Sequence, residues 1–211
     1  PADTYDFDFE RTVVSVDGNA VTLDAPMVQS FEARFGGGSI FKYDFPGRVR
    51  EAGVENIRLV SEYKTGQEDS DERHATDAIH ILRAEDVWVK NVTALHFVRT
   101  CVTADRASRH VTVADSLCID PVSPIRGGRR YSFYLIGQGA LVTRCATRGG
   151  RHDFITGSRL PGPNAFVDCL AIQTFEDIGP HHRWAMGTLF DNVQGGVIRV
   201  RNRANRGSGH G

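Results

Sequence analysis

A short pattern of alternating β-forming residues recurs along the chain and constrains the fold more than any other feature. Each copy has alternating apolar or β-branched residues, then Asn, Asp or Cys, then a small or apolar residue. With the fifth letter as marker, successive copies are 24, 30, 24 and 23 residues apart. The copies are VWVKNV (87–92), VTVADS (111–116), LVTRCA (141–146), AFVDCL (165–170) and TLFDNV (188–193), with a weaker one in VENIRLVS (54–61).

A period in the low twenties, with one insertion of about six residues, is typical of a solenoid. The fixed leucines of a leucine-rich repeat are absent, whereas β-branched residues and frequent Gly and Asn turns favour a parallel β-helix. Its coils would stack about 4.8 Å apart, the spacing of β-strands. The five markers would then form one ladder at a turn, where Asn and Asp bond backbone groups and Cys fills the same small space. They are Asn91, Asp115, Cys145, Cys169 and Asn192.

Each coil also carries a second expected strand, and the N-terminal region differs from the repeats. The second strands are 78–82, 99–104, 131–136, 152–157 and 182–187. In residues 1–46, Asp17-Gly18-Asn19 separates two alternating apolar runs, which predicts a β-hairpin. We therefore predict an all-β chain with an N-terminal β segment (1–46) and a parallel β-helix (47–211). Because the chain stops without a polar cap, we expect further C-terminal coils to be missing.

Charge is divided unevenly along the chain. Residues 1–120 hold 13 Lys and Arg against 21 Asp and Glu, whereas residues 121–211 hold 12 Arg, no Lys and 5 acidic residues. The guanidinium fork suits carboxylate, sulfate and phosphate groups, so an anionic ligand is expected on the C-terminal half. Surface arginines without a ligand are the alternative. We expect neither a membrane span nor a nucleic-acid partner, since no long apolar run or binding motif occurs.

The four cysteines form no Cys-x-x-Cys pair, which argues against a thiolate zinc site. An even number permits disulfides without requiring them. We favour buried free thiols for Cys101, Cys118, Cys145 and Cys169 because two of them are ladder markers.

The repeat resembles the right-handed parallel β-helix superfamily of pectin-lyase-like proteins, over roughly residues 54–211. That superfamily includes polysaccharide lyases, glycoside hydrolases such as polygalacturonases, uronate epimerases and phage tailspikes. The resemblance implies a right-handed coil, a carbohydrate substrate and an extracellular or periplasmic location. Gly-His-Gly at 209–211 matches one part of the polygalacturonase fingerprint, but its Asn-Thr-Asp and Asp-Asp parts are absent. The acidic calcium cluster of pectate lyases is also not evident.

The spacing of the markers predicts which residues of adjacent repeats lie side by side, and so where candidate catalytic residues meet. Asp153 and Asp177 each follow a cysteine marker by eight residues, and His152 and Glu176 follow by seven. If the register holds, the two aspartates stack about 5 Å apart in adjacent coils. Two carboxylates at such a short distance can share a proton, bind a metal or serve a retaining glycosidase.

The surrounding residues favour β-elimination on an anionic, uronic-acid-containing polysaccharide. This reaction needs a cation that neutralises the uronate carboxylate, a base and an acid. Arginines could neutralise, a histidine could act as base, and Tyr131 or Tyr134 could act as acid. The catalytic candidates are His152, Asp153, Glu176, Asp177, His181 and His182; the substrate-binding candidates are Arg148, Arg151, Arg183, Trp184 and Tyr134.

Three other interpretations stay open. A glycoside hydrolase on the same fold would use Asp153, Glu176 or Asp177 as paired carboxylates. A non-catalytic glycan-binding or structural β-helix would use none of the candidates in chemistry. A metal site would need the histidines to converge with the aspartates, and such mixed ligands are unspecific. We assign no metal and no cofactor, and keep calcium as an open alternative.

Overall fold

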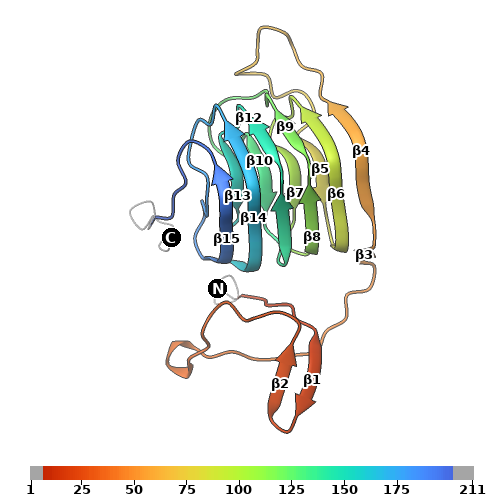
Figure 1. Cartoon of the computed structure of the whole chain (residues 1–211), viewed down its shortest axis with the longest axis vertical. Helices are drawn as coiled ribbons and strands as arrows, with labels where there is room; N and C mark the ends of the chain where they lie inside the picture. Colours follow the sequence, from red (N-terminus) through yellow and green to blue (C-terminus); the bar gives the residue numbers. More distant parts are fainter. Residues whose placement is uncertain (1–6, 202–211) are drawn as a thin grey trace.

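The chain is all-β with largely parallel sheets. A computed structural model describes residues 7–201 (Figure 1), and within that range the only helical segment is a single 3₁₀ turn, Ala33–Phe35. A four-stranded sheet has the order β13-β10-β7-β5, formed by β5 (Asp77–Ile81), β7 (Thr100–Ala104), β10 (Tyr131–Leu135) and β13 (His152–Thr156). A nine-stranded sheet contains β3 (Val49–Arg50), β4 (Gly53–Val60), β6 (Ala84–Leu95), β8 (Arg109–Ala114), β9 (Leu117–Ile119), β11 (Ala140–Thr143), β12 (Ala146–Arg148), β14 (Leu160–Ile172) and β15 (Ala185–Gln194).

The strands of each large sheet stack in parallel at the spacing that the repeat predicts. In the nine-stranded sheet, one column of paired residues lies 24, 29, 24 and 24 residues apart, namely Val89, Val113, Val142, Phe166 and Phe190. All six expected marker segments contain strand residues, although the markers Asp115 and Cys145 lie between strands. Four of the five expected second strands are also confirmed, as β5, β7, β10 and β13.

The fifth expected second strand, over residues 182–187, is wrong. No strand covers 182–184, and β15 begins only at Ala185 and pairs with β14. On its outer edge β13 pairs instead through a single parallel bridge between Ile155 and Gly179. Pro180 lies just after this bridge and lacks the N–H that a longer ladder would need, so the chain leaves the sheet there.

The ladder at the turn is also one residue out of register at two of its five positions. The stacked residues are Asn91, Asp115, Arg144, Asp168 and Asn192, all with φ between 50° and 55°. Asn and Asp tolerate this left-handed conformation better than most residues. Side chains bond along the ladder, as in Asn192 Nδ2 donating to Asp168 Oδ1 at 2.7 Å. Cys145 and Cys169 come one residue later and are buried, because the bend returns them to the core.

The core lies between the two large sheets, where aromatic rings connect one sheet to the other. Phe133 and Phe154 stack in the four-stranded sheet with ring centroids 5.6 Å apart. Phe154 then contacts Phe166 of the nine-stranded sheet at 5.8 Å, and Phe166 stacks on Phe190 at 5.0 Å. Such ring pairs add about 0.5–1.5 kcal/mol each beyond the area they bury.

The expectation of four free thiols is half wrong. Cys101 of β7 and Cys118 of β9 form a disulfide between the two sheets, with their Cα atoms 5.7 Å apart. Cys145 and Cys169 are free and buried, as expected. Sequence spacing could not pair Cys101 with Cys118, because the contact depends on how the two sheets face each other.

The N-terminal segment carries the predicted hairpin and lies below the parallel sheets (Figure 1). β1 (Val13–Asp17) pairs antiparallel with β2 (Ala20–Leu23), and Gly18 adopts φ 57° in the turn. Glu10 of this segment pairs with Arg109 of the nine-stranded sheet, and Arg48, just after the segment, bonds both Glu10 and Glu85. The division at residue 46 stays a prediction. Gly-His-Gly and the C-terminal end, which the expectation of missing coils concerns, lie outside the described residues.

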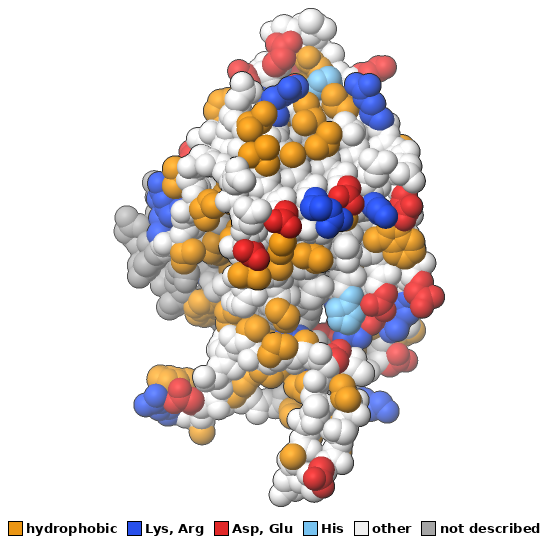
Figure 2. Space-filling model, viewed as in Figure 1, with side chains coloured by type: hydrophobic (Ala, Val, Ile, Leu, Met, Phe, Trp, Pro, Cys, Tyr) orange, Lys and Arg blue, Asp and Glu red, His pale blue; other side chains and the backbone are white. Residues whose placement is uncertain are grey.

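The face formed by the nine-stranded sheet carries a band of Lys, Arg, Asp and Glu side chains across its middle (Figure 2). Arg144 and Asp115, at the ends of β11 and β8 in this sheet, form one ion pair, with Nε and Oδ1 2.7 Å apart. Within residues 7–201, no helix is both long and apolar enough to cross a membrane.

Candidate functional site

The segment between β14 and β15 passes over β13 and brings two of its residues to that strand. Glu176 donates its backbone N–H to the Arg151 carbonyl at 3.0 Å, and Ile155 bridges to Gly179. This register places the backbone of Asp177 beside that of Asp153, as the marker spacing predicts. The segment then turns back through His181 and His182 toward the same face.

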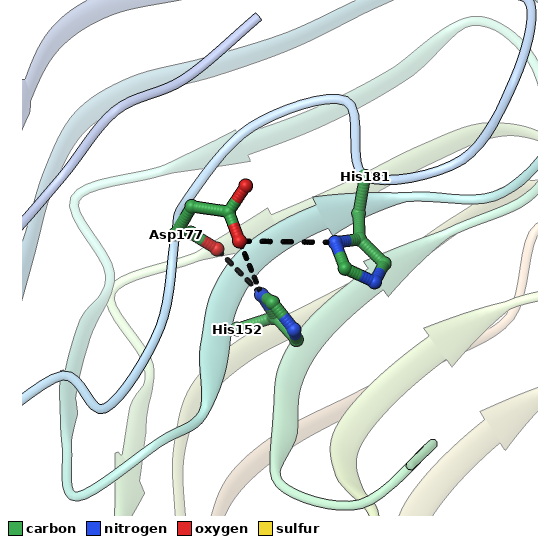
Figure 3. A group of neighbouring side chains, drawn as sticks. All are labelled: His152, Asp177 and His181. Carbon is green, nitrogen blue, oxygen red and sulfur yellow. Dashed lines mark hydrogen bonds and ion pairs between the residues drawn. The ribbon is translucent and has the colours of Figure 1, made fainter. Parts of the chain in front are cut away.

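Three of the candidates, His152, Asp177 and His181, converge into one cluster (Figure 3). The His152 Nδ1 atom lies 2.6 Å from the Asp177 backbone carbonyl and 3.4 Å from its Oδ1. His181 Nδ1 lies 3.9 Å from the same Oδ1, and the two imidazole rings are 4.0 Å apart between centroids. The Asp177 carboxylate is therefore directed at two histidines.

His152 is fully buried, and its hydrogen bonding fixes its tautomer. A carbonyl oxygen can only accept, so Nδ1 carries the proton and Nε2 presents a lone pair. Burial lowers the pKa of His152, and the nearby charge of Arg151 lowers it further, although the hydrogen bond to Asp177 opposes this. The imidazole is thus neutral near pH 7. The buried Nε2 atom has no hydrogen-bond partner.

Two tyrosines extend the cluster along the face of the four-stranded sheet that points away from the core. Tyr134 alternates with the core residues Phe133 and Leu135, so its ring points outward. The ring of Tyr131 contacts those of Tyr134 and His152, each with a centroid distance of 5.4 Å. The ring centroid of His182 lies 6.4 Å from that of Tyr134 and 6.5 Å from that of Tyr131, so imidazole and phenol groups share one surface.

Tyr134 keeps its proton, and two arginines that the sequence analysis missed lie near it. Burial, followed by the charge of Tyr131, raises the pKa of Tyr134, while Arg99 and Arg106 act in the opposite direction. Arg99 bonds Asp77 at 2.9 Å, and Arg106 donates to the carbonyls of Ser158 and Arg159. The spacing between Asp77 and Arg99, close to the period of the sequence repeat, is a signal that could have found this pair.

Other candidates lie apart from the cluster or face elsewhere. Arg148 is on the nine-stranded sheet and bonds Asp120 at 2.7 Å. Trp184 packs on Phe7 with ring centroids 5.0 Å apart. Asp153 is fully buried and accepts from Ser132 at 2.8 Å, so its carboxylate does not share partners with that of Asp177.

Burial raises the pKa of Asp153, against the lowering effect of the hydroxyls around it. Arg151 is half-buried and Glu176 exposed, and both charges act on His152. Arg183 is half-exposed and accepts the Arg159 N–H through its backbone carbonyl at 2.8 Å.

Two groups among the described residues offer ligand atoms close enough for one metal ion. They are His152 with Asp177 and His181, and Glu85 with Asp86 and His110; in each, the atoms lie within 4.8 Å of one another. None of the protein-family models, curated proteins or solved structures compared with the chain matches it.

Proposed function

We propose that the chain is a right-handed parallel β-helix that cleaves an anionic, uronic-acid-containing polysaccharide by β-elimination. The proposed site is the outward face of the four-stranded sheet. The observation that carries this proposal is the pairing of an imidazole with a protonated phenol, His182 with Tyr134, at a ring distance of 6.4 Å. The in-register parallel strands and their near-constant spacing support the β-helix.

The three roles of β-elimination can be distributed over this face. Arg106, whose charge acts on Tyr134, neutralises the C6 carboxylate and acidifies the C5 proton, whereas Arg99 is already paired with Asp77. His182 removes that proton, the C4–O bond breaks as the C4–C5 double bond forms, and Tyr134 donates its proton to the leaving oxygen. The phenol of Tyr134 is protonated at neutral pH and so has a proton to donate, but its raised pKa makes it a weaker acid than an ordinary tyrosine.

The hydrolase alternative has less support from the geometry. A retaining glycosidase needs two carboxylates about 5–5.5 Å apart that both reach the sugar. Asp153 is enclosed in the core with Ser132, and Asp177 is directed at the two histidines. We therefore do not propose paired carboxylate catalysis here.

We further propose an extracellular or periplasmic location for this activity. The disulfide between Cys101 and Cys118 supports this location, because disulfides persist mainly in oxidising compartments. Polysaccharides that contain uronic acids would be met in those compartments.

The test is the rise in ultraviolet absorbance that an unsaturated uronate end produces. The protein would be incubated with a panel of polyuronates and sulfated glycans, alongside His182→Ala and the control His110→Ala. His110 is an exposed histidine of the nine-stranded sheet that bonds Asp86. We expect a rise with the wild type and the control, and a loss of about 10²–10⁴-fold with His182→Ala.

Other outcomes would overturn the proposal. New reducing ends without a rise in absorbance would establish hydrolysis. Binding to a glycan without any cleavage would assign the face to recognition alone. A rise that His182→Ala leaves unchanged would place the chemistry elsewhere on the molecule.

A further inference from the structure

We propose that His152, Asp177 and His181 form a binding site for a divalent transition-metal ion, of which zinc is the best fit. Two imidazoles and one carboxylate are a common ligand set for this ion. The site goes beyond the elimination proposed above and does not rest on it.

The spacing of the three ligand groups fits a small ion. Zinc holds nitrogen and oxygen ligands at about 2.0–2.2 Å, so tetrahedral ligand atoms lie roughly 3.4 Å apart. Asp177 Oδ1 is 3.4 Å from His152 Nδ1 and 3.9 Å from His181 Nδ1. A small closure of the segment that carries His181 would complete the triangle. The ion would replace the proton on His152 Nδ1, since metals displace protons from their ligands.

A second observation points independently to a ligand. Asp177 is more than nine-tenths buried, and its Oδ1 atom, which faces both histidines, accepts no hydrogen bond. A buried carboxylate oxygen without a donor is costly, and such atoms are rare in folded proteins. The neighbouring His152 does not satisfy this oxygen, because its Nδ1–H donates to the Asp177 backbone carbonyl instead. A cation between the three groups would compensate for it.

The chemistry of the ligands selects the class of ion. Calcium and magnesium prefer oxygen ligands, whereas imidazole suits zinc, copper, iron and nickel. The His181 side chain is 11% exposed and His152 is 1% exposed, so the cluster opens to solvent on the His181 side only. That opening gives an ion a route of entry and leaves room for a fourth ligand from solvent.

The second group with close ligand atoms provides the contrast. Glu85 there is bonded by Arg109 at 2.7 Å and by Arg50 at 2.9 Å. Arginine charges already neutralise this carboxylate, so no cation is needed. His110, which belongs to this group, is therefore a matched control for His181.

The experiment titrates Zn²⁺, and Co²⁺ as a spectroscopic probe, into the metal-free full chain followed by calorimetry and visible absorption. We expect one ion per chain and a Co²⁺ spectrum typical of nitrogen and oxygen ligands. Asp177→Asn and His181→Gln should each weaken binding by more than the roughly 10–100-fold that loss of an outer hydrogen-bond partner causes. His110→Ala should bind like the wild type.

Two results would overturn the site: no saturable binding to the wild type, or binding that His181→Gln leaves intact. Thermal melting of each variant without metal shows whether it folds, and added Zn²⁺ should raise the melting temperature of the wild type but not of His181→Gln. These readouts do not involve polysaccharide. Failure of metal binding would therefore leave the elimination proposal standing, and inactivity on polysaccharides would leave the metal site standing.

Discussion

Two clusters of buried charged groups differ in how completely their atoms are bonded. Glu85, at the contact between the N-terminal segment and the nine-stranded sheet, is held by Arg48, Arg50 and Arg109 through both of its oxygens. At Asp177, beside the four-stranded sheet, the side-chain oxygen Oδ1 faces two histidines without a hydrogen bond. Both carboxylates are buried, yet only the first has its charge neutralised by the chain itself.

This difference separates a structural role from a functional one. A buried ion pair that is complete holds two parts of a fold together, and breaking it leaves a charge that is expensive to bury. An incomplete cluster contributes less to stability and persists where a ligand or a reaction uses it. Glu85 is accordingly assigned to stability and the Asp177 cluster to function. The predictions below test that assignment.

The largest effect is expected from Arg48→Ala. The Arg48 side chain is 3% exposed and bonds both Glu85, at 3.2 Å, and Glu10, at 2.8 Å. Its removal should cost about 3–5 kcal/mol of the free energy of unfolding, measured by urea denaturation. Arg50→Ala is the matched control: Arg50 bonds the same Glu85 oxygen, but its side chain is 60% exposed. A change of about 1 kcal/mol or less is expected there, and equal losses would contradict the assignment.

Acid should weaken the protein through Glu85. Burial alone raises the pKa of this residue, but hydrogen bonds from Arg109 and Arg48 outweigh it, so the pKa lies below its ordinary value of 4.5. A lowered folded-state pKa contributes stability above the unfolded value, and this contribution is lost as the pH falls through the folded value. At pH values below about 4.5 the melting temperature should decrease. The dependence of melting temperature on pH should be shallower in Glu85→Gln. An unchanged slope would show that other carboxylates carry the effect.

The smallest effect on stability, with a large one on activity, is expected from Tyr134→Phe. The ring contacts with Tyr131 and His182 remain, so the free energy of unfolding should change by about 1 kcal/mol or less. The elimination rate should fall by about 10²–10⁴-fold because the acid is lost. Tyr63→Phe, on a tyrosine that contacts His74 and His96, is the control. Retained activity in Tyr134→Phe would move the acid role to another residue.

The sequence predicted the strands better than the turns between them. Alternating apolar residues determine which segments are strands and how far apart they stack, and this held for every marker segment. The turn ladder needed one more fact, the left-handed backbone, which falls on Arg144 and Asp168 and not on the cysteines beside them. A one-residue shift of this kind is invisible to apolar alternation, because each cysteine is itself compatible with a turn.

The candidate site was predicted in register but not in orientation. The marker spacing predicted that the backbone of Asp177 lies beside that of Asp153, yet the two carboxylates point to different partners. The convergence of His152 with His181 depends on how residues 180–184 pass back over β13, which no local pattern encodes. Arg99 and Arg106 were missed because they lie outside the basic C-terminal part of the chain.

The central claim is that Glu85 serves stability and Asp177 serves function. The most direct test is equilibrium urea denaturation of Glu85→Gln and Asp177→Asn, side by side and without metal. We predict a loss of about 3 kcal/mol or more for Glu85→Gln, which removes the carboxylate that Arg48, Arg50 and Arg109 share, and of about 1 kcal/mol or less for Asp177→Asn. Equal losses in the two variants would contradict the account and make the Asp177 cluster a structural element.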